Sequence, residues 1–224
     1  MKIIVYSVNT GGYDEFREPS TVDPNVRYIL FTDNKYYKSK IWEICHIDFL
    51  PKNLDNRRKA RYVKLNPHIV LPEHDVSIWV DHCYRPKFKN SEQFLKEINH
   101  DLISCFKHDV RKCVYSEAEE VKRQKLDYPN LVDNQMKRYR LEGLPQNFGL
   151  FDSGFTVRTN NPQVKKFNET WWKELSENSA RDQLSQVYSS WKTKVPIKPI
   201  TVDSNIYSNR YLEPKKTHPK KWTV

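Results

Sequence analysis

Short strands alternate with a helix along the first half of the chain, and this alternation constrains the fold more than any other feature. Apolar runs rich in β-branched residues predict strands. Residues 54–66 contain neither glycine nor proline and predict a helix that ends at Pro67. Strands that alternate with helices form a largely parallel sheet covered by helices, so the sequence predicts the α/β class. The predicted strands are residues 2–8, 27–31, 41–47 and 76–80.

The second half of the chain contains more predicted helices than strands. We expect strands at 102–106 and 148–158, and a loop with one short strand in the last thirty residues, which are rich in proline and lysine. Neither an internal repeat nor a low-complexity linker divides the chain, so we expect one domain over residues 1–224. The predicted helices are residues 91–99, 116–125, 130–142, 162–175 and 180–191.

A glycine pair or an aspartate follows each of three predicted strands. The Gly11-Gly12 pair follows the first strand, Asp33 the second and Asp81 the fourth. Open α/β sheets bind ligands beyond the carboxyl ends of their strands, so these residues are candidates for one site. The glycines could bring backbone N–H groups close to a ligand, and Asp33 could accept hydrogen bonds from a base or ribose. Ordinary turns explain both features equally well, and the glycines match neither nucleotide-binding fingerprint.

The predicted helix at 54–66 carries a basic stripe. Arg57, Arg61 and Lys64 are spaced i, i+4 and i+7, which places them on one helical face. Guanidinium groups bind phosphate oxygens through paired N–H donors, so a stripe beside strand ends could hold a diphosphate. A solvated basic face explains the spacing as well, and both interpretations stay open.

Three carboxylates stand in segments that could form a catalytic site. Asp81 ends an apolar strand, where a carboxylate is costly unless it faces a cleft, a partner or a metal. Asp152 lies in a strand with glycines on either side, which suits a catalytic acid or a bulge. Asp182 and Gln183 could clasp sugar hydroxyls, although acidic residues are also common at helix starts.

The formal net charge is +10, from 38 Lys and Arg against 28 Asp and Glu. A basic excess attracts phosphates, nucleic acids or anionic surfaces. Here the basic residues are scattered among acidic ones, except for Lys215, Lys216, Lys220 and Lys221, and no nucleic-acid-binding module is recognisable. We therefore expect no nucleic-acid partner.

The cysteines and the apolar runs of the sequence indicate in which cellular compartment the protein is expected. Its four cysteines form no C-x-x-C pair, so neither a zinc knuckle nor a redox motif is indicated and reduced thiols are expected. No signal peptide is recognisable, and no apolar run reaches the roughly 18–20 residues that span a bilayer. We expect a protein without a membrane span that resides in the cytoplasm, or in the host cytoplasm if it is viral.

Taken together, a series of segments resembles one known family. The series comprises the Gly-Gly turn, Phe31-Thr32-Asp33, the basic helix, Leu71-Pro72, Ser77 to Asp81, His108 to Arg111, Tyr115 to Ala118, Glu142 to Pro145, Asp152 to Gly154, Trp171-Trp172 and Arg181 to Ser185. It is similar to a glycosyltransferase-like family found in bacteria, in plant Golgi proteins and in capsid-glycosylating transferases of large algal viruses. The resemblance covers residues 1 to about 190.

The resemblance implies a single GT-A-like domain with a mixed, mostly parallel central sheet flanked by helices. Residues 1 to about 110 would form the nucleotide-binding half, and residues from about 111 to 224 the donor-sugar and acceptor half with a C-terminal tail. The expected reaction moves a sugar from a nucleoside-diphosphate sugar, UDP-sugar in particular, to a hydroxyl of a glycan or glycoprotein, which could be a viral capsid glycan. The expected nucleotide-binding residues are Thr10, Gly11, Gly12, Asp33, Arg57, Arg61 and Lys64.

A more distant similarity, to glycogenin-like retaining transferases, implies a metal site and a donor-sugar site. Asp81 falls on the first position of their Asp-x-Asp metal motif, and His218 could match their C-terminal metal ligand. Asp182 and Gln183 fall on the pair that binds the donor sugar. The expected cofactor is Mn²⁺ or Mg²⁺, and retention of configuration is favoured. Asp152 would lie beside the reacting carbon, where an inverting route would use it as a base.

The metal motif departs from that pattern. It reads Asp81-His82-Cys83, so its second carboxylate is missing, and a thiol is a poor ligand for either metal. The metal could be held by Asp81 with His82 or His218, or could be absent. In the second case Arg57, Arg61 and Lys64 would have to neutralise the diphosphate.

Three rival functions remain open at this point. A glycan hydrolase could use two of Asp81, Asp152 and Asp182 as its carboxylate pair and would not bind UDP. A nucleic-acid-binding protein would exploit the positive charge, and salt would weaken its binding steeply. A carbohydrate-binding protein could have kept the fold and lost the chemistry.

Overall fold

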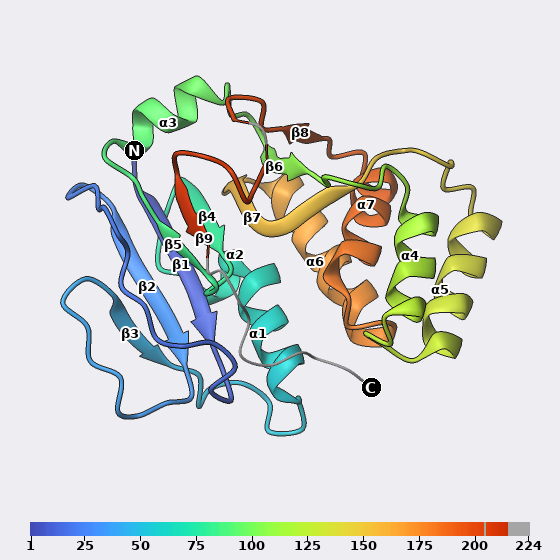
Figure 1. Cartoon of the computed structure of the whole chain (residues 1–224), viewed down its shortest axis with the longest axis horizontal. Coiled ribbons are helices and arrows are strands. Elements are labelled where there is room, and N and C mark those ends of the chain that lie inside the picture. The colour runs from blue at the N-terminus through green and yellow to red at the C-terminus, as the bar shows by residue number, and fades with distance from the viewer. Residues whose placement is uncertain (204, 215–224) are drawn as a thin grey trace.

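The computed structural model describes residues 1–203 and 205–214, and a seven-stranded sheet runs through its centre (Figure 1). The strand order is β3-β2-β1-β4-β7-β6-β8. All neighbouring strands are parallel except β7, which runs antiparallel to both β4 and β6. The strands are β1 (Ile3–Asn9), β2 (Arg27–Thr32), β3 (Glu43–His46), β4 (Val76–Val80), β6 (Ile103–Lys107), β7 (Phe151–Thr159) and β8 (Ile197–Pro199).

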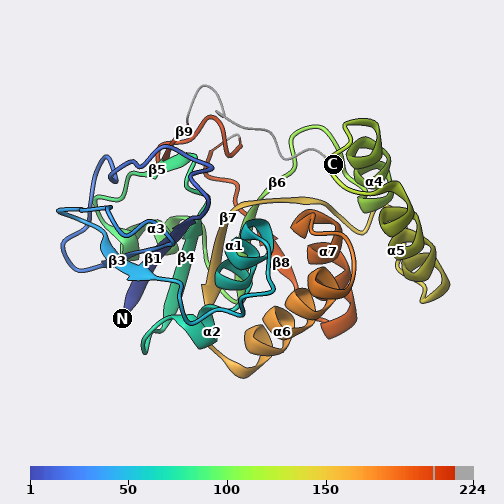
Figure 2. The ribbon, with the colours of Figure 1, turned by 90° about the horizontal axis from the view of Figure 1, so that it is seen from below.

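Helices flank this sheet. Figure 2 shows α1, α6 and α7 side by side on one side of the sheet. A small antiparallel pair, β5 (Tyr84–Pro86) with β9 (Leu212–Pro214), adds a second sheet. The helices are α1 (Asn56–Leu65), α2 (Pro67–Val70), α3 (Ser91–Glu97), α4 (Val114–Arg123), α5 (Pro129–Leu141), α6 (Pro162–Glu177) and α7 (Asp182–Thr193).

Both faces of the sheet are buried, which is why its central strands are apolar almost throughout. Ile3 and Val5 of β1 pack into a cluster that includes Phe94 of α3. The alternate residues Ile4 and Tyr6 pack on the other face in a cluster with Val63 of α1. Successive side chains of a strand point to opposite faces, so β1 joins the two layers. The predicted single α/β domain with a mixed, mostly parallel sheet is confirmed, and it is consistent with a GT-A-like fold.

A third cluster holds α4 and α5 against α7. Val121, Val132 and Leu184 are completely buried in it, and Tyr139 stacks on Tyr188 with ring centroids 3.9 Å apart. Figures 1 and 2 both show α4 and α5 side by side at the end of the molecule opposite β3. This packing fixes the start of α7 relative to the sheet. None of the described helices is both long enough and apolar enough to cross a membrane.

The structure differs from the predicted elements in a few places. The helix predicted to end at Pro67 does end there, since α1 stops at Leu65, but Pro67 also begins a short helix, α2, that was not predicted. The first position of a helix tolerates proline because the N–H there has no helical partner. Among the described residues of the last thirty, there are two short strands, β8 and β9, where one was expected. β5 was not predicted. It pairs with β9 across a long sequence separation, with Tyr84 opposite Pro214, so no local pattern signals it.

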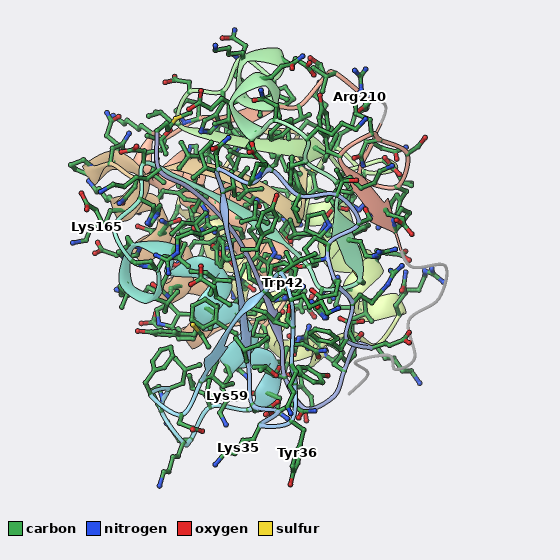
Figure 3. All side chains as sticks on the ribbon, turned by 90° about the vertical axis from the view of Figure 1, so that its left-hand side faces the viewer. Lys35, Tyr36, Trp42, Lys59, Lys165 and Arg210 are labelled. Atoms are coloured by element: carbon green, nitrogen blue, oxygen red, sulfur yellow. The ribbon has the colours of Figure 1, made fainter. Side chains whose placement is uncertain are left out.

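The carboxyl ends of β1, β2, β4 and β6 lie at one edge of the sheet, because these strands run in the same direction. β7 runs the other way, so its first residues, beginning at Phe151, reach the same edge. Figure 3 shows Lys35 and Tyr36, in the loop after β2, pointing away from the molecule at this edge. The topology therefore gathers Thr10, Asp81, His108 and Asp152.

Candidate functional site

A cleft of about 350 Å³ opens at this edge of the sheet. It is lined by the ends of β1, β4 and β6, the start of β7, α1, α4 and the residues around the start of α7. Most of the site residues expected from the sequence lie here, although they come from five separate parts of the chain. Those that line the cleft are Thr10, Arg57, Arg61, Asp81, Asp152, Asp182 and Gln183.

The remaining expected residues lie elsewhere. Gly11, Gly12, Asp33 and Lys64 are not among the residues that line the cleft. His218, expected as a metal ligand, lies outside the residues that the structure describes. No observation tests a role for His218.

Gly11 and Asp33 join the loops that follow β1 and β2. The backbone N–H of Gly11 donates to both carboxylate oxygens of Asp33, at 3.1 and 2.9 Å. Gly11 has φ +61°, and an added Cβ would lie 2.4 Å from Asn56 Nδ2, so the loop requires glycine there. Thr10 Oγ1 donates to the carbonyl of Asn56, the first residue of α1. These contacts shape the loop beside the cleft.

Lys64 lies beneath the cleft, and we call Lys64 and the three residues around its ammonium group, Asp81, Ser153 and Asp182, the floor of the cleft. The Lys64 side chain is completely buried, and its Nζ lies 2.6 Å from Asp182 Oδ2, 3.2 Å from Asp81 Oδ1 and 3.3 Å from Ser153 Oγ. An ammonium group has three N–H donors, and here each has an oxygen acceptor. The solvated basic face that could have explained the stripe on α1 is therefore wrong, because the stripe points inward.

Asp182 is the closest counter-ion of Lys64 in this floor. Burial by itself would raise the pKa of its carboxyl, but Arg61, Lys64 and Arg181 hold that pKa far below its usual range. Its Oδ2 lies 3.3 Å from Arg61 Nε and accepts a hydrogen bond from Ser153 Oγ at 3.1 Å. Trp171 Nε1 donates to the Asp182 carbonyl at 2.9 Å, which fixes the first turn of α7. Asp182 is thus ionised and surrounded by cations.

Three guanidinium groups form a second cationic region, which we call the arginine wall: Arg57, Arg61 and Arg181. Arg57 Nη1 donates to the Leu126 carbonyl at 3.1 Å. Arg57 Nε, Arg57 Nη2 and Arg181 Nε are buried and have no hydrogen-bond partner among residues 1–203 and 205–214. Burial, with repulsion from Arg181 and Arg61, lowers the pKa of Arg57 to about 10. Buried donors without acceptors are costly, which indicates that the wall receives an anion.

Asp152 opens β7 beside these cations. Its Oδ1 accepts a hydrogen bond from the Gly154 N–H at 2.8 Å. Burial raises the pKa of its carboxyl to about 6, and the charges of Asp81 and Asp182 add to that rise. A carboxyl that titrates near neutral pH can accept a proton from a bound hydroxyl.

The donor set around Asp81 does not fit a divalent metal. Asp81 Oδ1 already accepts hydrogen bonds from Trp79 Nε1 at 2.7 Å and from Lys64 Nζ. Burial, with the nearby carboxylates, raises the pKa of the Cys83 thiol well above its usual value, so it stays protonated. Within the described part of the chain, no three His, Cys, Asp or Glu residues are grouped to hold a metal ion.

Several residues of the cleft were not assigned from the sequence. Arg181 is one, although it directly precedes Asp182 in a segment that carries the family resemblance. Three others are His108, Arg111 and Glu117: Arg111 Nε donates to Glu117 Oε2, and His108 Nε2 lies 3.6 Å from the same oxygen. Tyr207 also lines the cleft and is 58% exposed. Its segment lies near the C-terminus and has no sequence signal for this position.

One comparison with known proteins identifies the family. A family model described as TOD1/MUCI70, glycosyltransferase-like domain, matches residues 1–212. The chain belongs to this family. The match spans every described residue that lines the cleft, so the cleft of this TOD1/MUCI70 domain is the place to look for glycosyl transfer. No curated protein matches the chain.

Proposed function

We propose that the chain transfers a sugar from a UDP-sugar to a hydroxyl of a glycan or glycoprotein. One observation carries the proposal: the arginine wall and Asp152 line the same cleft, at the carboxyl edge of the parallel strands. Sugar transfer needs cations at the departing diphosphate and a carboxylate near the reacting carbon. Both are present in one cleft of a glycosyltransferase-like domain.

The arginine wall would hold the diphosphate. Guanidinium groups donate paired hydrogen bonds to phosphate oxygens, and Arg57 and Arg181 have buried donors without acceptors in the part of the chain that the structure describes. The negative charge on the diphosphate increases as the bond to the sugar breaks, so fixed cations stabilise the transition state more than the ground state. This preference would lower the barrier to transfer.

The loop after β1 would hold the nucleoside. Thr10 lines the cleft, and the Gly11–Asp33 contact sets the backbone beside it. Asp33 would then act by shaping the loop, because its carboxylate already accepts the Gly11 N–H. The uridine would bind between this loop and α1, with its phosphates directed to Arg57 and Arg61.

Asp152 would take the proton from the acceptor hydroxyl as the sugar is transferred, which corresponds to an inverting route. Gln183, whose Nε2 lies 3.4 Å from the Phe151 carbonyl, would contact a donor-sugar hydroxyl. Asp182 would act on the donor indirectly, by holding Arg61 and Lys64. The similarity to glycogenin-like enzymes favours retention instead, and the anomeric configuration of the product, measured by NMR, decides between the two.

The test is calorimetric titration with UDP, followed by a donor screen that detects released UDP. We expect saturable UDP binding and, with the right donor and acceptor, turnover that Asp152→Asn abolishes. Absence of binding to UDP and to every other nucleoside diphosphate would contradict the proposal.

A glycan hydrolase has less support, because Asp81 and Asp182 both pair with Lys64 and neither carboxylate is free to act with Asp152 as a catalytic pair.

A further inference from the structure

We infer that side chains of this protein, rather than a divalent metal ion at Asp81, neutralise the diphosphate of the donor. Lys64 fixes the carboxylates in the floor of the cleft, and Arg57, Arg61 and Arg181 contact the phosphates. The inference rests on the proposed function, since it concerns how the same cleft binds the nucleotide.

Lys64 occupies the position that a metal would need. Its ammonium group is surrounded by oxygens of Asp81, Asp182 and Ser153, which come from three different elements. Two carboxylates and a hydroxyl are the hard oxygen ligands that Mn²⁺ and Mg²⁺ also prefer. The buried ammonium group already uses them, so a metal ion could bind there only by displacing it.

The charges nearby also disfavour a second cation. Asp182 is compensated by Lys64 and by Arg61, whose Nε lies 3.3 Å from its carboxylate. A divalent ion beside Asp81 would be repelled by Lys64 at close range in a partly buried site, where Coulomb energies are larger than in water. Cys83, at the position of the missing second carboxylate, offers sulfur, a poor ligand for either metal. Among the described residues, the two carboxylates of the floor are therefore already paired, Asp81 with Lys64 and Asp182 with Lys64 and Arg61.

The arginine wall supplies the positive charge instead. Arg57 on α1 and Arg181 directly before α7 line the cleft from two elements, and each keeps a buried donor without an acceptor among the described residues. The first turn of α7 also lies at the cleft, and the N-terminus of a helix of twelve residues favours an anion. A diphosphate placed there would satisfy all these groups without a bridging metal.

The first experiment compares UDP binding in EDTA with UDP binding in Mn²⁺, by calorimetry on the full chain. We expect dissociation constants that agree within about twofold, because the cations that hold the phosphates are covalent parts of the protein. Loss of binding in EDTA by about tenfold or more, restored by Mn²⁺, would overturn the inference and leave the proposed function standing. Failure to bind UDP in either buffer would instead overturn the proposed function.

The second experiment assigns the phosphates to the wall. Arg57→Gln and Arg181→Gln should each weaken UDP binding by about tenfold, the value of one charge-assisted hydrogen bond, and leave uridine binding, followed by NMR, unchanged. Arg58→Gln is the matched control, since Arg58 pairs with Asp55 on the same helix and does not line the cleft. Equal losses for UDP and uridine, or an equal loss in the control, would contradict the assignment.

Discussion

The floor and the arginine wall of the cleft are both cationic, but they differ in how their charges are paired. Each donor of the Lys64 ammonium has an acceptor in the protein, whereas Arg57 and Arg181 keep buried donors without an acceptor in the described chain. A fully paired buried charge is part of the scaffold, and breaking the pair destabilises the fold. A buried donor that lacks an acceptor is expected to bind a ligand. The comparison therefore separates residues that shape the site from residues that bind substrate.

The largest effect is expected when the floor is broken. Lys64→Met leaves Asp182 and Asp81 without their shared cation, so the free energy of unfolding should fall by about 3–5 kcal/mol. Thermal or urea denaturation measures it. Lys59→Met, on the same helix but outside the cleft, is the control. If both variants lose the same free energy of unfolding, the ion pairs of Lys64 with Asp81 and Asp182 do not stabilise the fold.

The second prediction concerns Asp152, which lies between floor and wall. Asp152→Asn should lower kcat by about 10²–10⁴-fold, because general-base catalysis contributes that much, and should leave UDP binding unchanged. In the unmodified enzyme kcat/KM should rise with pH through about 6, as the carboxyl loses its proton. Steady-state kinetics across pH 5–8 checks this. A variant with full activity would contradict the role of Asp152.

Acid should lower the stability of the protein through the carboxylates of the floor, because the guanidinium groups of the wall keep their charge at low pH. The pKa of Asp182 lies far below its ordinary value in the folded protein, so its ion pairs contribute stability at pH values above the ordinary carboxyl pKa of about 4. That contribution decreases as pH falls below about 4, because Asp182 takes up a proton in the unfolded chain while its carboxyl in the folded protein stays ionised. Denaturation followed between pH 3 and 7 should show this loss, and Lys64→Met should flatten it. A slope unaffected by Lys64→Met would place the acid sensitivity elsewhere.

Removing a charge from the wall should change stability much less. Arg57→Met removes a buried guanidinium group with unsatisfied donors, but it also removes a hydrogen bond to the Leu126 carbonyl and an ion pair with Asp127 at 4.0 Å. These effects oppose each other, so the free energy of unfolding of the ligand-free protein should change by no more than about 1 kcal/mol. The same variant should bind UDP more weakly. Thermal denaturation with and without UDP measures both. A large loss of stability in the ligand-free variant would show that Arg57 belongs to the scaffold, as Lys64 does.

The smallest effect is expected at the mouth of the cleft. Tyr207 is exposed beside Tyr84, with ring centroids 6.4 Å apart, and an aromatic face there can stack on an acceptor sugar. Tyr207→Ala should raise the acceptor KM by about three- to tenfold, the value of about 1 kcal/mol of stacking, and should not change UDP binding. Tyr207→Phe should retain the wild-type KM. Initial rates at varied acceptor concentration test it, and a changed affinity for UDP would contradict an acceptor role.

Local patterns were sufficient to predict most of the fold. The apolar runs of β1, β2 and β4 and the helix formers of α1 are visible in the sequence, because a buried parallel sheet needs nearly continuous apolar strands. β5 and β9 pair across a long stretch of chain, and their short segments carry no periodicity of their own. The placement of Asp81 at this edge followed from its position after a predicted strand, whereas that of Asp152 depends on the antiparallel direction of β7, which no local pattern indicates.

The sequence could not predict which basic residues pair with carboxylates inside the protein and which keep donors for a ligand. Arg57, Arg61 and Lys64 share one face of α1, and spacing cannot show that Lys64 is buried under Asp182, which is far away in the sequence. Arg181 reaches the same cleft from the residue before α7, a placement that depends on the packing of α4 and α5 against α7. Pairing among buried charges is a property of the tertiary structure, so it was visible only once the fold was known.

The most direct test of the account is a ³¹P NMR titration of UDP with the protein in EDTA. We predict that both phosphorus resonances shift on binding and that Arg57→Gln and Arg181→Gln reduce the shifts, because the guanidinium groups contact the phosphates directly. Shifts confined to the uridine protons, with unchanged phosphorus resonances until Mg²⁺ is added, would contradict the account. They would show that the donors of the arginine wall serve another ligand.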